Sequence, residues 1–202
     1  RRQRQMCIRD RLTQCPWRFG FTGTLDGTLT HKLVLEGLFG PVEKVTTTAD
    51  LIKSEHLSKF KINIITLKYS EQTRSQLRRA KYQDEIDFLV RSDARNRFIR
   101  NLCMSLEGNT LALFNFVDKH GKVLYNMMQD AKRPVFFVHG GEKGEDRDEI
   151  RQIVEKQKNS IIVASYGTFS TGVNIRNLHN IVFASPSKSR VRNLQSIGRG
   201  LR

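Results

Sequence analysis

The stretch TLALFNFVDKHGKVLYNMMQDAKRPVFFVHG, residues 110–140, decides the fold of this chain. Two short apolar runs, Thr110–Phe114 and Pro134–Val138, lie on either side of a segment with helical spacing at 118–130. Such alternation is typical of the crossover units of a parallel sheet, which buries its strands on both faces. The pattern continues with apolar runs at Ser160–Ala164 and Asn180–Ala184 and with expected helices at 145–158, 167–172 and 189–202. We therefore expect an α/β fold with helices on both faces of a parallel sheet.

The chain before residue 110 predicts a less regular arrangement. Residues 17–24 (WRFGFTGT) predict a short buried strand that packs through Trp17 and Phe19. A helix is expected at 31–38 and a polar connector at 42–60. Asn63–Tyr69 predicts a strand, because it is rich in β-branched residues. One helix is then expected at 71–92, with an apolar stripe of Leu77, Tyr82, Ile86 and Leu89. A second helix is expected at 93–107, with Cys103 on its apolar side.

Length and composition limit the classes to which this protein can belong. With 202 residues, the chain has room for one domain and part of another. No run approaches the roughly 18 apolar residues of a membrane-spanning helix, and no secretory signal is present, so we expect a cytoplasmic protein. Cys7, Cys15 and Cys103 form no C-x-x-C pair, which argues against a zinc site and a disulfide framework.

The positive charge is unevenly distributed. The formal net charge is +15, residues 1–18 hold six Arg and one Asp, and residues 160–202 hold six basic residues and no acidic residue. A basic stretch without acids suits a polyphosphate such as nucleic acid or a nucleotide. A solvated basic surface is the alternative explanation of the charge alone.

Two features of the predicted fold point to a site. Ligands of parallel α/β sheets bind beyond the carboxyl ends of the strands, where this sequence places Asn115-Phe116, His139-Gly140-Gly141, Ser165-Tyr166-Gly167 and Ser185-Pro186-Ser187. In the last helix, Gln195, Arg199 and Arg202 fall at i, i+4 and i+7 and share one face. Two guanidinium groups and an amide on one face suit phosphate oxygens, whereas a solvated basic helix is again the alternative.

Four stretches carry a family resemblance. Motif VI of superfamily-two helicases, Q-x-x-G-R-x-x-R, is resembled by QSIGRGLR at 195–202. Their motif V and the strand after it are resembled by ASYGTFSTGVNIRNLHNIVFA at 164–184. Motif IV is resembled by LALFNFVDKHGKVL at 111–124, and motif III by FGFTGTLDG at 19–27. The order and spacing of the motifs match that family, and within it the phage recombination helicases are the most similar branch.

The resemblance implies a fold and an activity. Residues 1–48 would be the end of a first RecA-like lobe, and 49–202 a second RecA-like lobe truncated at its end. The parent would be an ATP-dependent DNA helicase or translocase that uses ATP and Mg²⁺. It would act, as a monomer, on branched DNA or RNA–DNA hybrids in recombination, repair or replication.

The resemblance also implies roles for individual residues. Arg199 and Arg202 would be arginine fingers on the γ-phosphate of ATP, with Gln195 ordering their face of the helix. Gly172 and Asn174 would border the nucleotide, although many members carry Asp at the position of Asn174, and Thr22 and Thr24 would couple the two lobes. The nucleic-acid backbone would be gripped by Asn115, Phe116, Gly140, Ser165 and Thr171.

Other parts of a motor are absent from the sequence. It contains no G-x-x-x-x-G-K-[ST] loop to hold phosphates, and Asp84-Glu85-Ile86-Asp87 is expected to be a solvated helix face. The Mg²⁺ ligands are therefore expected in a missing N-terminal part, and the chain alone is expected to be inactive. His139 and His179 have no partner at metal-ligand spacing, so no metal site is expected. His120 opens the helix after motif IV and is interpreted as a helix cap, with a contact residue as the alternative. A non-enzymatic nucleic-acid-binding module remains an alternative, and a small-nucleotide enzyme is disfavoured because the G-x-G-x-x-G turn is lacking.

Overall fold

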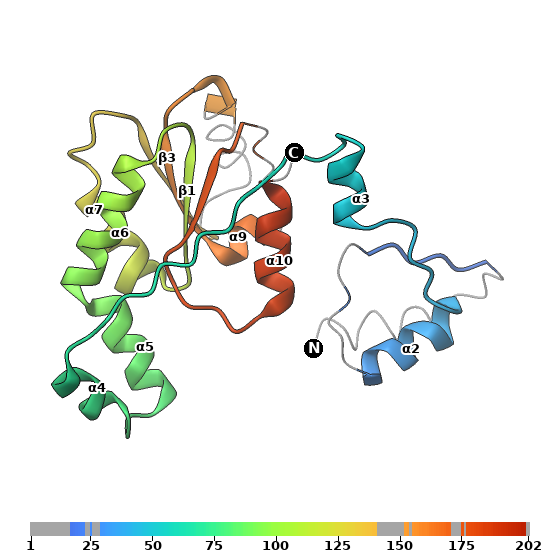
Figure 1. The fold of residues 1–202 in the computed structure, drawn as a ribbon, viewed down its shortest axis with the longest axis horizontal. Coiled ribbons are helices and arrows are strands. Elements are labelled where there is room, and N and C mark those ends of the chain that lie inside the picture. Colours follow the sequence, from blue (N-terminus) through green and yellow to red (C-terminus); the bar gives the residue numbers. More distant parts are fainter. Residues whose placement is uncertain are drawn as a thin grey trace. The chain divides into compact units, whose positions relative to one another are not determined.

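The computed structural model describes residues 17–22, 25, 29–140, 152–153, 155–170, 175 and 177–200 (Figure 1). The chain divides into two compact units, Arg1–Glu55 and His56–Arg202. The sequence placed the boundary between residues 48 and 49, and the assignment of the first part to a first motor lobe stays a prediction. Among the described helices, none is long and apolar enough to cross a membrane.

The first unit contains two described helices, α2 (Leu29–Phe39) and α3 (Thr48–Lys53), and neither has a buried residue. Helix α2 confirms the predicted helix at 31–38. Helix α3 lies inside the predicted connector, and it begins at Thr47, whose hydroxyl accepts a hydrogen bond from the backbone N–H of Asp50 at 3.1 Å. The strand predicted at 17–24 is wrong for the described residues 17–22, which have no regular structure and leave Trp17 and Phe19 each 75% exposed.

The second unit is built on a four-stranded parallel sheet. The strands are β1 (Thr110–Phe114), β2 (Val135–Val138), β3 (Ile161–Ser165) and β4 (Asn180–Phe183), in the order β2-β3-β1-β4. All four predicted apolar runs form these strands. Every residue of the two central strands, β1 and β3, is buried, which explains why their sequences are continuously apolar and do not alternate.

Helices cover both faces of this sheet, as predicted (Figure 1). On one face, α6 (Asp93–Ser105), π-helix η1 (Val117–Gly121) and α7 (Lys122–Met127) pack over a buried cluster that includes Cys103, Phe114 and Leu124. On the other face, near α9 (Tyr166–Ser170) and α10 (Arg190–Arg199), a second cluster includes Leu113, Ile162 and Tyr166. Burial also raises the pKa of the Cys103 thiol to about 12, so this cysteine is a core residue as expected.

The segment before the sheet differs from its prediction. The single helix expected at 71–92 is two helices, α4 (Glu71–Leu77) and α5 (Tyr82–Arg91). Ile86 is buried as predicted, but Tyr82 is 49% exposed and does not belong to the apolar stripe. The strand predicted at Asn63–Tyr69 is wrong, because β-branched residues form a strand only when a neighbouring strand pairs with them, and these residues join no described sheet.

A π-helix links β1 to α7 where the sequence predicted the start of an α-helix. The backbone N–H of Gly121 donates to the carbonyl of Phe116 at 2.9 Å, which is an i→i−5 bond. A Cβ atom on Gly121 would lie 2.5 Å from the ring of Phe114. The close approach of this turn to the end of β1 therefore requires glycine at 121.

The amino ends of the strands are joined by Asn109, which is fully buried. Its side-chain amide donates to the carbonyls of Gln157 and Asn177, both at 2.8 Å. Its side-chain oxygen accepts from the backbone N–H of Ser160 at 2.9 Å and from the Ser160 hydroxyl at 2.8 Å. The backbone N–H of Asn109 donates to His179 Nδ1 at 3.2 Å. One side chain thus connects the segments that lead into β1, β3 and β4.

Candidate nucleic-acid and nucleotide interface

The carboxyl ends of β1 and β4 meet at Asn115, the first residue after β1. Its backbone N–H donates to Ser185 Oγ at 3.1 Å, and its side-chain amide donates to the Pro186 carbonyl at 3.0 Å. Its side-chain oxygen accepts from Arg192 of α10 at 3.3 Å. Asn115 therefore connects the end of β1 to both the loop after β4 and the first turn of α10.

A buried hydrogen-bonded chain holds the loop after β4 from the other side. His120 Nδ1 lies 2.8 Å from Ser185 Oγ, and His120 Nε2 lies 3.1 Å from Asn96 Oδ1. Because the Asn96 amide nitrogen donates to the Val90 carbonyl at 2.9 Å, its oxygen is the acceptor and His120 Nε2 is the donor. Burial keeps the ring neutral at neutral pH, so its other nitrogen, Nδ1, is the acceptor for the Ser185 hydroxyl. The interpretation of His120 as a helix cap is wrong, since its side chain is fully buried in this chain of contacts.

Two more side chains fix the same loop. The Tyr166 hydroxyl donates to the Ser185 carbonyl at 2.9 Å, and Arg95 donates to the Ala184 carbonyl at 2.7 Å. The loop between β4 and α10 is therefore held by hydrogen bonds from α6, η1 and α9 as well as from Asn115. This arrangement places the first turn of α10 rigidly beside the end of β1.

Burial controls the charge of these groups. It lowers the pKa of His120 to about 4, with a smaller contribution from the positive charge of Arg95. It raises the pKa of Tyr166 to about 12, although Arg192 and Arg95 act in the opposite direction. His120 and Tyr166 are consequently uncharged at neutral pH, and the positive charge near this loop belongs to arginine and lysine side chains such as Arg95, Lys188 and Arg192.

Helix α10 carries the predicted phosphate-binding face. It begins at Ser189, whose hydroxyl accepts from the backbone N–H of Arg192 at 3.3 Å. Gln195 is exposed and Arg199 is half-buried, and both share one face with Arg192, which lies three residues before Gln195. The Arg192 guanidinium also lies 5.9 Å from the centre of the Tyr166 ring. The described part of α10 therefore presents an Arg–Gln–Arg stripe that begins at Asn115.

The other predicted site residues lie in different parts of the chain. Ser165 is 8% exposed, its hydroxyl lies 2.7 Å from Thr168 Oγ1, and a Cβ atom on Gly140 would lie 3.8 Å from that same Thr168 atom, so the ends of β2 and β3 meet here. Phe116 is half-buried at the start of η1. Thr22 is exposed in the first unit. The predictions for Thr24, Thr171, Gly172, Asn174 and Arg202 lie outside the described residues.

Sequence reasoning missed several residues of this interface. Arg192 could have been found, because it precedes Gln195 by three and Arg199 by seven residues and so lies on the predicted face. The contact of His120 with Ser185 joins residues 65 positions apart. The sequence placed Ser185 at a strand end and His120 at the start of a helix, but it did not predict that they meet. Arg95 lies on a predicted helix and Tyr166 at a predicted strand end, but their bonds to the loop carbonyls depend on the tertiary fold.

The described residues of this interface are chemically suited to bind the phosphates of a nucleotide, but not to bind its metal ion. Gln195 and Arg199 offer N–H donors, which suit phosphate oxygens and not a cation. No group of three or more His, Cys, Asp or Glu side chains among the described residues could hold a metal. The Asp84–Asp87 segment lies in helix α5, where Asp87 pairs with Lys119 at 3.2 Å and Asp84 accepts from the Lys81 N–H at 3.3 Å.

Comparisons with known proteins agree with this geometry. The family model described as the helicase conserved C-terminal domain matches residues 94–202. The chain is 34% identical over 194 residues to the "ATP-dependent DNA helicase uvsW" of Enterobacteria phage T4, covering 95% of this chain and 38% of that protein. The crystal structure of T4 UvsW matches with a TM-score of 0.62 and 34% identity, covering 83% of this chain and 32% of the other. The chain thus spans less than two-fifths of the length of this relative.

These matches confirm the predicted family and the predicted parallel α/β fold. The family model includes β1, β2, β3, β4 and α10, which are the elements that form the interface described above. The chain therefore belongs to the family of the helicase conserved C-terminal domain, and its sheet with helices on both faces is the RecA-like fold of that family.

Proposed function

We propose that this chain contributes the second motor lobe, and the end of the first, to an ATP-dependent DNA helicase or translocase. The observation that carries the proposal is the stripe of Arg192, Gln195 and Arg199 on α10. It begins at Asn115 at the carboxyl edge of the sheet, within the residues matched by the helicase family. The similar T4 protein is named an ATP-dependent DNA helicase.

In this proposal α10 acts on the nucleotide. ATP supplies the phosphoryl group whose transfer to water drives the motor. The guanidinium groups of Arg199 and Arg202 bind the γ-phosphate oxygens and stabilise their negative charge in the transition state. Such arginines raise kcat by roughly 10³–10⁵-fold in other phosphoryl-transfer enzymes. Gln195 orders the same face, while Gly172 and Asn174 border the nucleotide. The Mg²⁺ ligands and the phosphate-binding loop come from a longer polypeptide.

The carboxyl edge forms the nucleic-acid track. Asn115, Phe116, Gly140, Ser165 and Thr171 grip the backbone of DNA through amide, hydroxyl and main-chain groups, which bind phosphate without reading sequence. Thr22 and Thr24 couple the two lobes, so that closure of the nucleotide cleft moves one lobe along the strand. The substrates are branched DNA or RNA–DNA hybrids, and the protein acts as a monomer in the cytoplasm.

The split nucleotide site can be tested with two polypeptides. The 202-residue chain should hydrolyse almost no ATP, whereas a longer protein that includes a phosphate-binding loop should be active. In the longer protein, Arg202→Ala should lower kcat by roughly 10³-fold or more and change the affinity for DNA less than twofold. Clear ATP turnover by the 202-residue chain that is abolished by Arg199→Ala would contradict the split site.

The same experiment separates the motor from a simple binding module. If Arg202→Ala lowers kcat and DNA affinity equally, the arginine grips nucleic acid and not ATP. If a longer protein that includes a phosphate-binding loop hydrolyses no ATP while DNA still binds, the chain is a basic nucleic-acid-binding module, and the motor assignment is wrong.

A further inference from the structure

Two basic segments far apart in the sequence lie beside each other at the carboxyl edge of the sheet. The first, RRAKY at Arg78–Tyr82, joins α4 to α5, and the second, PSKSRVR at Pro186–Arg192, leads into α10. The Lys188 ammonium lies 4.0 Å from the centre of the Tyr82 ring and so joins the two segments. We call this surface the basic edge; its cations are Arg78, Arg79, Lys81, Lys188, Arg190 and Arg192, and its two segments contain no acidic residue.

The cations of the basic edge differ from other cations of the same unit. Arg74 pairs with Glu71 at 2.9 Å, Arg97 with Asp93 at 2.6 Å, and Lys122 with Asp118 at 2.7 Å. All six cations of the basic edge are exposed, and no carboxylate among the described residues forms an ion pair with any of them. Exposed cations that are not held in ion pairs with carboxylates are available to the phosphates of a polyanion.

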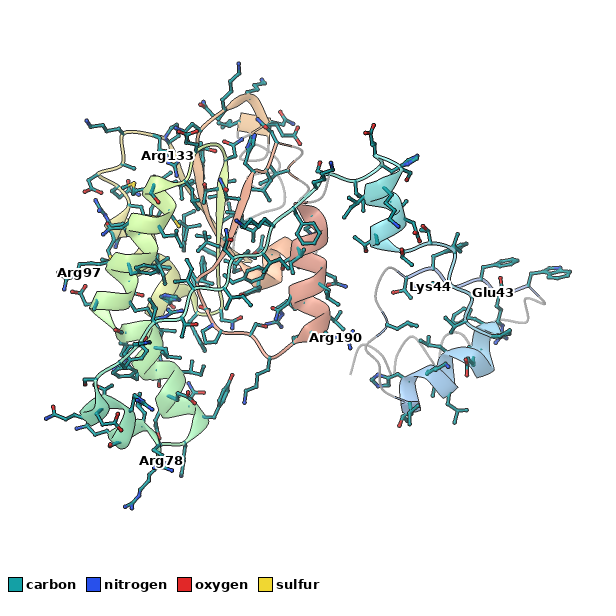
Figure 2. The ribbon with its side chains drawn as sticks, in the orientation of Figure 1. Glu43, Lys44, Arg78, Arg97, Arg133 and Arg190 are labelled. Atoms are coloured by element: carbon teal, nitrogen blue, oxygen red, sulfur yellow. The ribbon has the colours of Figure 1, made fainter. Side chains whose placement is uncertain are left out.

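The placement of these residues is visible in Figure 2. Arg190 lies at the lower end of α10, and Arg78 lies below α4, so both stand along the lower side of the view. Arg97, on the outer side of α6, and Arg133 lie away from that side. The carboxyl ends of β1 and β4 approach the same side through Asn115 and Arg192. The basic edge is therefore continuous with the interface described above and extends it toward α4 and α5.

Tyr82 adds a feature that a purely electrostatic surface lacks. Its ring is 49% exposed, and the only described contact over it is a flexible lysine. Aromatic rings beside cations bind single strands, because an unpaired base can stack on the ring while its phosphates meet the cations. The bases of a duplex are already stacked in the helix and cannot do this without unpairing.

We propose that the basic edge binds a single strand of nucleic acid, with one base stacked on Tyr82 and the backbone on Lys188, Arg190 and Arg192. The incoming base takes the place of the Lys188 ammonium, which then pairs with the flanking phosphate. The inference rests on the proposed function and deepens it, because it extends the track from the motif residues onto the helical segment before them.

The test measures binding of the 202-residue chain to a fluorescein-labelled 12-nucleotide oligo-dT and to a 12-base-pair duplex, by fluorescence anisotropy at several salt concentrations. Tyr82→Ala should weaken binding of oligo-dT by roughly five- to hundredfold and change the duplex affinity less than twofold. Tyr82→Phe keeps the ring and should bind like the parent chain. Lys188→Ala and Arg190→Ala should weaken both ligands and reduce the salt slope for oligo-dT by about 0.7 each.

Arg97→Ala is the matched control, because it removes the same charge from α6, on a different side of the unit in Figure 2. If Tyr82→Ala and Arg190→Ala behave like Arg97→Ala while Asn115→Ala weakens binding, the extension is wrong and the proposed function stands. If Tyr82→Ala weakens oligo-dT and duplex equally, the edge does not select single strands and the proposal fails. If the parent chain binds neither ligand, both proposals fail. Circular dichroism of each variant checks that the fold is retained.

Discussion

The two units of this chain treat their apolar side chains in opposite ways. In the second unit, the strands and the helices α6 and α7 bury theirs in clusters around Leu113 and Phe114. In the first unit, α2 and α3 bury nothing, and Phe21 and Leu29 are 96% and 85% exposed. A helix satisfies its own backbone hydrogen bonds, whereas a strand needs a neighbour, so local sequence is enough for α2 but not for a strand at 17–22. Burial requires a second layer, which the second unit has in its sheet and helices and which the described residues of the first unit do not form.

The largest expected difference between the units concerns equal truncations of leucine. Leu124 in α7 is fully buried, whereas Leu33 in α2 is 72% exposed. Leu124→Ala should lower the free energy of unfolding of the second unit by about 2–5 kcal/mol, and Leu33→Ala should change stability by less than about 0.5 kcal/mol. Urea unfolding followed by circular dichroism measures both. Equal losses in the two variants would show that α2 has a buried face.

The next effect concerns pH and belongs to the second unit alone. The pKa of His120 is about 4 in the folded chain, against an ordinary value of 6.5. The unfolded chain therefore binds a proton first, and stability should fall as the pH drops from about 6.5 to about 4, by about 3 kcal/mol in total. His120→Gln removes this titration and should flatten that part of the stability profile. Parallel profiles of the parent chain and the variant would disprove the buried neutral histidine.

The smallest expected effect compares two glycines. A Cβ atom on Gly121 would lie 2.5 Å from the Phe114 ring, whereas a Cβ atom on Gly37 in α2 would meet nothing within 4 Å. Gly121→Ala should destabilise the second unit by about 1–3 kcal/mol through overpacking. Gly37→Ala should stabilise α2 by up to about 1 kcal/mol, because alanine favours the helix. Peptide-resolved hydrogen exchange assigns each change to its unit, and a neutral Gly121→Ala would contradict the tight π-helical turn.

The strands of the sheet could be predicted because each is encoded by a short apolar run in its own sequence, and the same pattern occurs four times. Thr110–Phe114 and its three counterparts are short continuous apolar runs between helices, which suits only buried strands. Asn63–Tyr69 carries an equally good composition but finds no partner strand, and composition does not report pairing. The π-helix was missed because its spacing resembles that of an α-helix, and the i→i−5 hydrogen bond from the Gly121 N–H to the Phe116 carbonyl distinguishes them.

The residues of the candidate site could be predicted where helical spacing or the end of a strand fixes their position. Gln195 and Arg199 share a face by spacing alone, and Asn115 follows from the end of β1. The bonds that fix the loop after β4 were not predictable, since Ser185, His120 and Asn96 come from three separate segments. Such networks form only after the sheet has brought their members together.

Asn109 bears on how the sheet avoids misalignment. In a strand such as TLALF, a shift of two residues would keep each side chain on its own face, so apolar burial alone discriminates weakly between the native alignment and the shifted one. The buried amide of Asn109 finds its partners at Ser160, Gln157 and Asn177 in one alignment only. A shifted strand would leave that amide without hydrogen bonds in the interior, at a cost of about 1–3 kcal/mol for each unsatisfied group. The hydrogen bonds of Asn109 therefore favour the native register of the parallel strands over a shifted one.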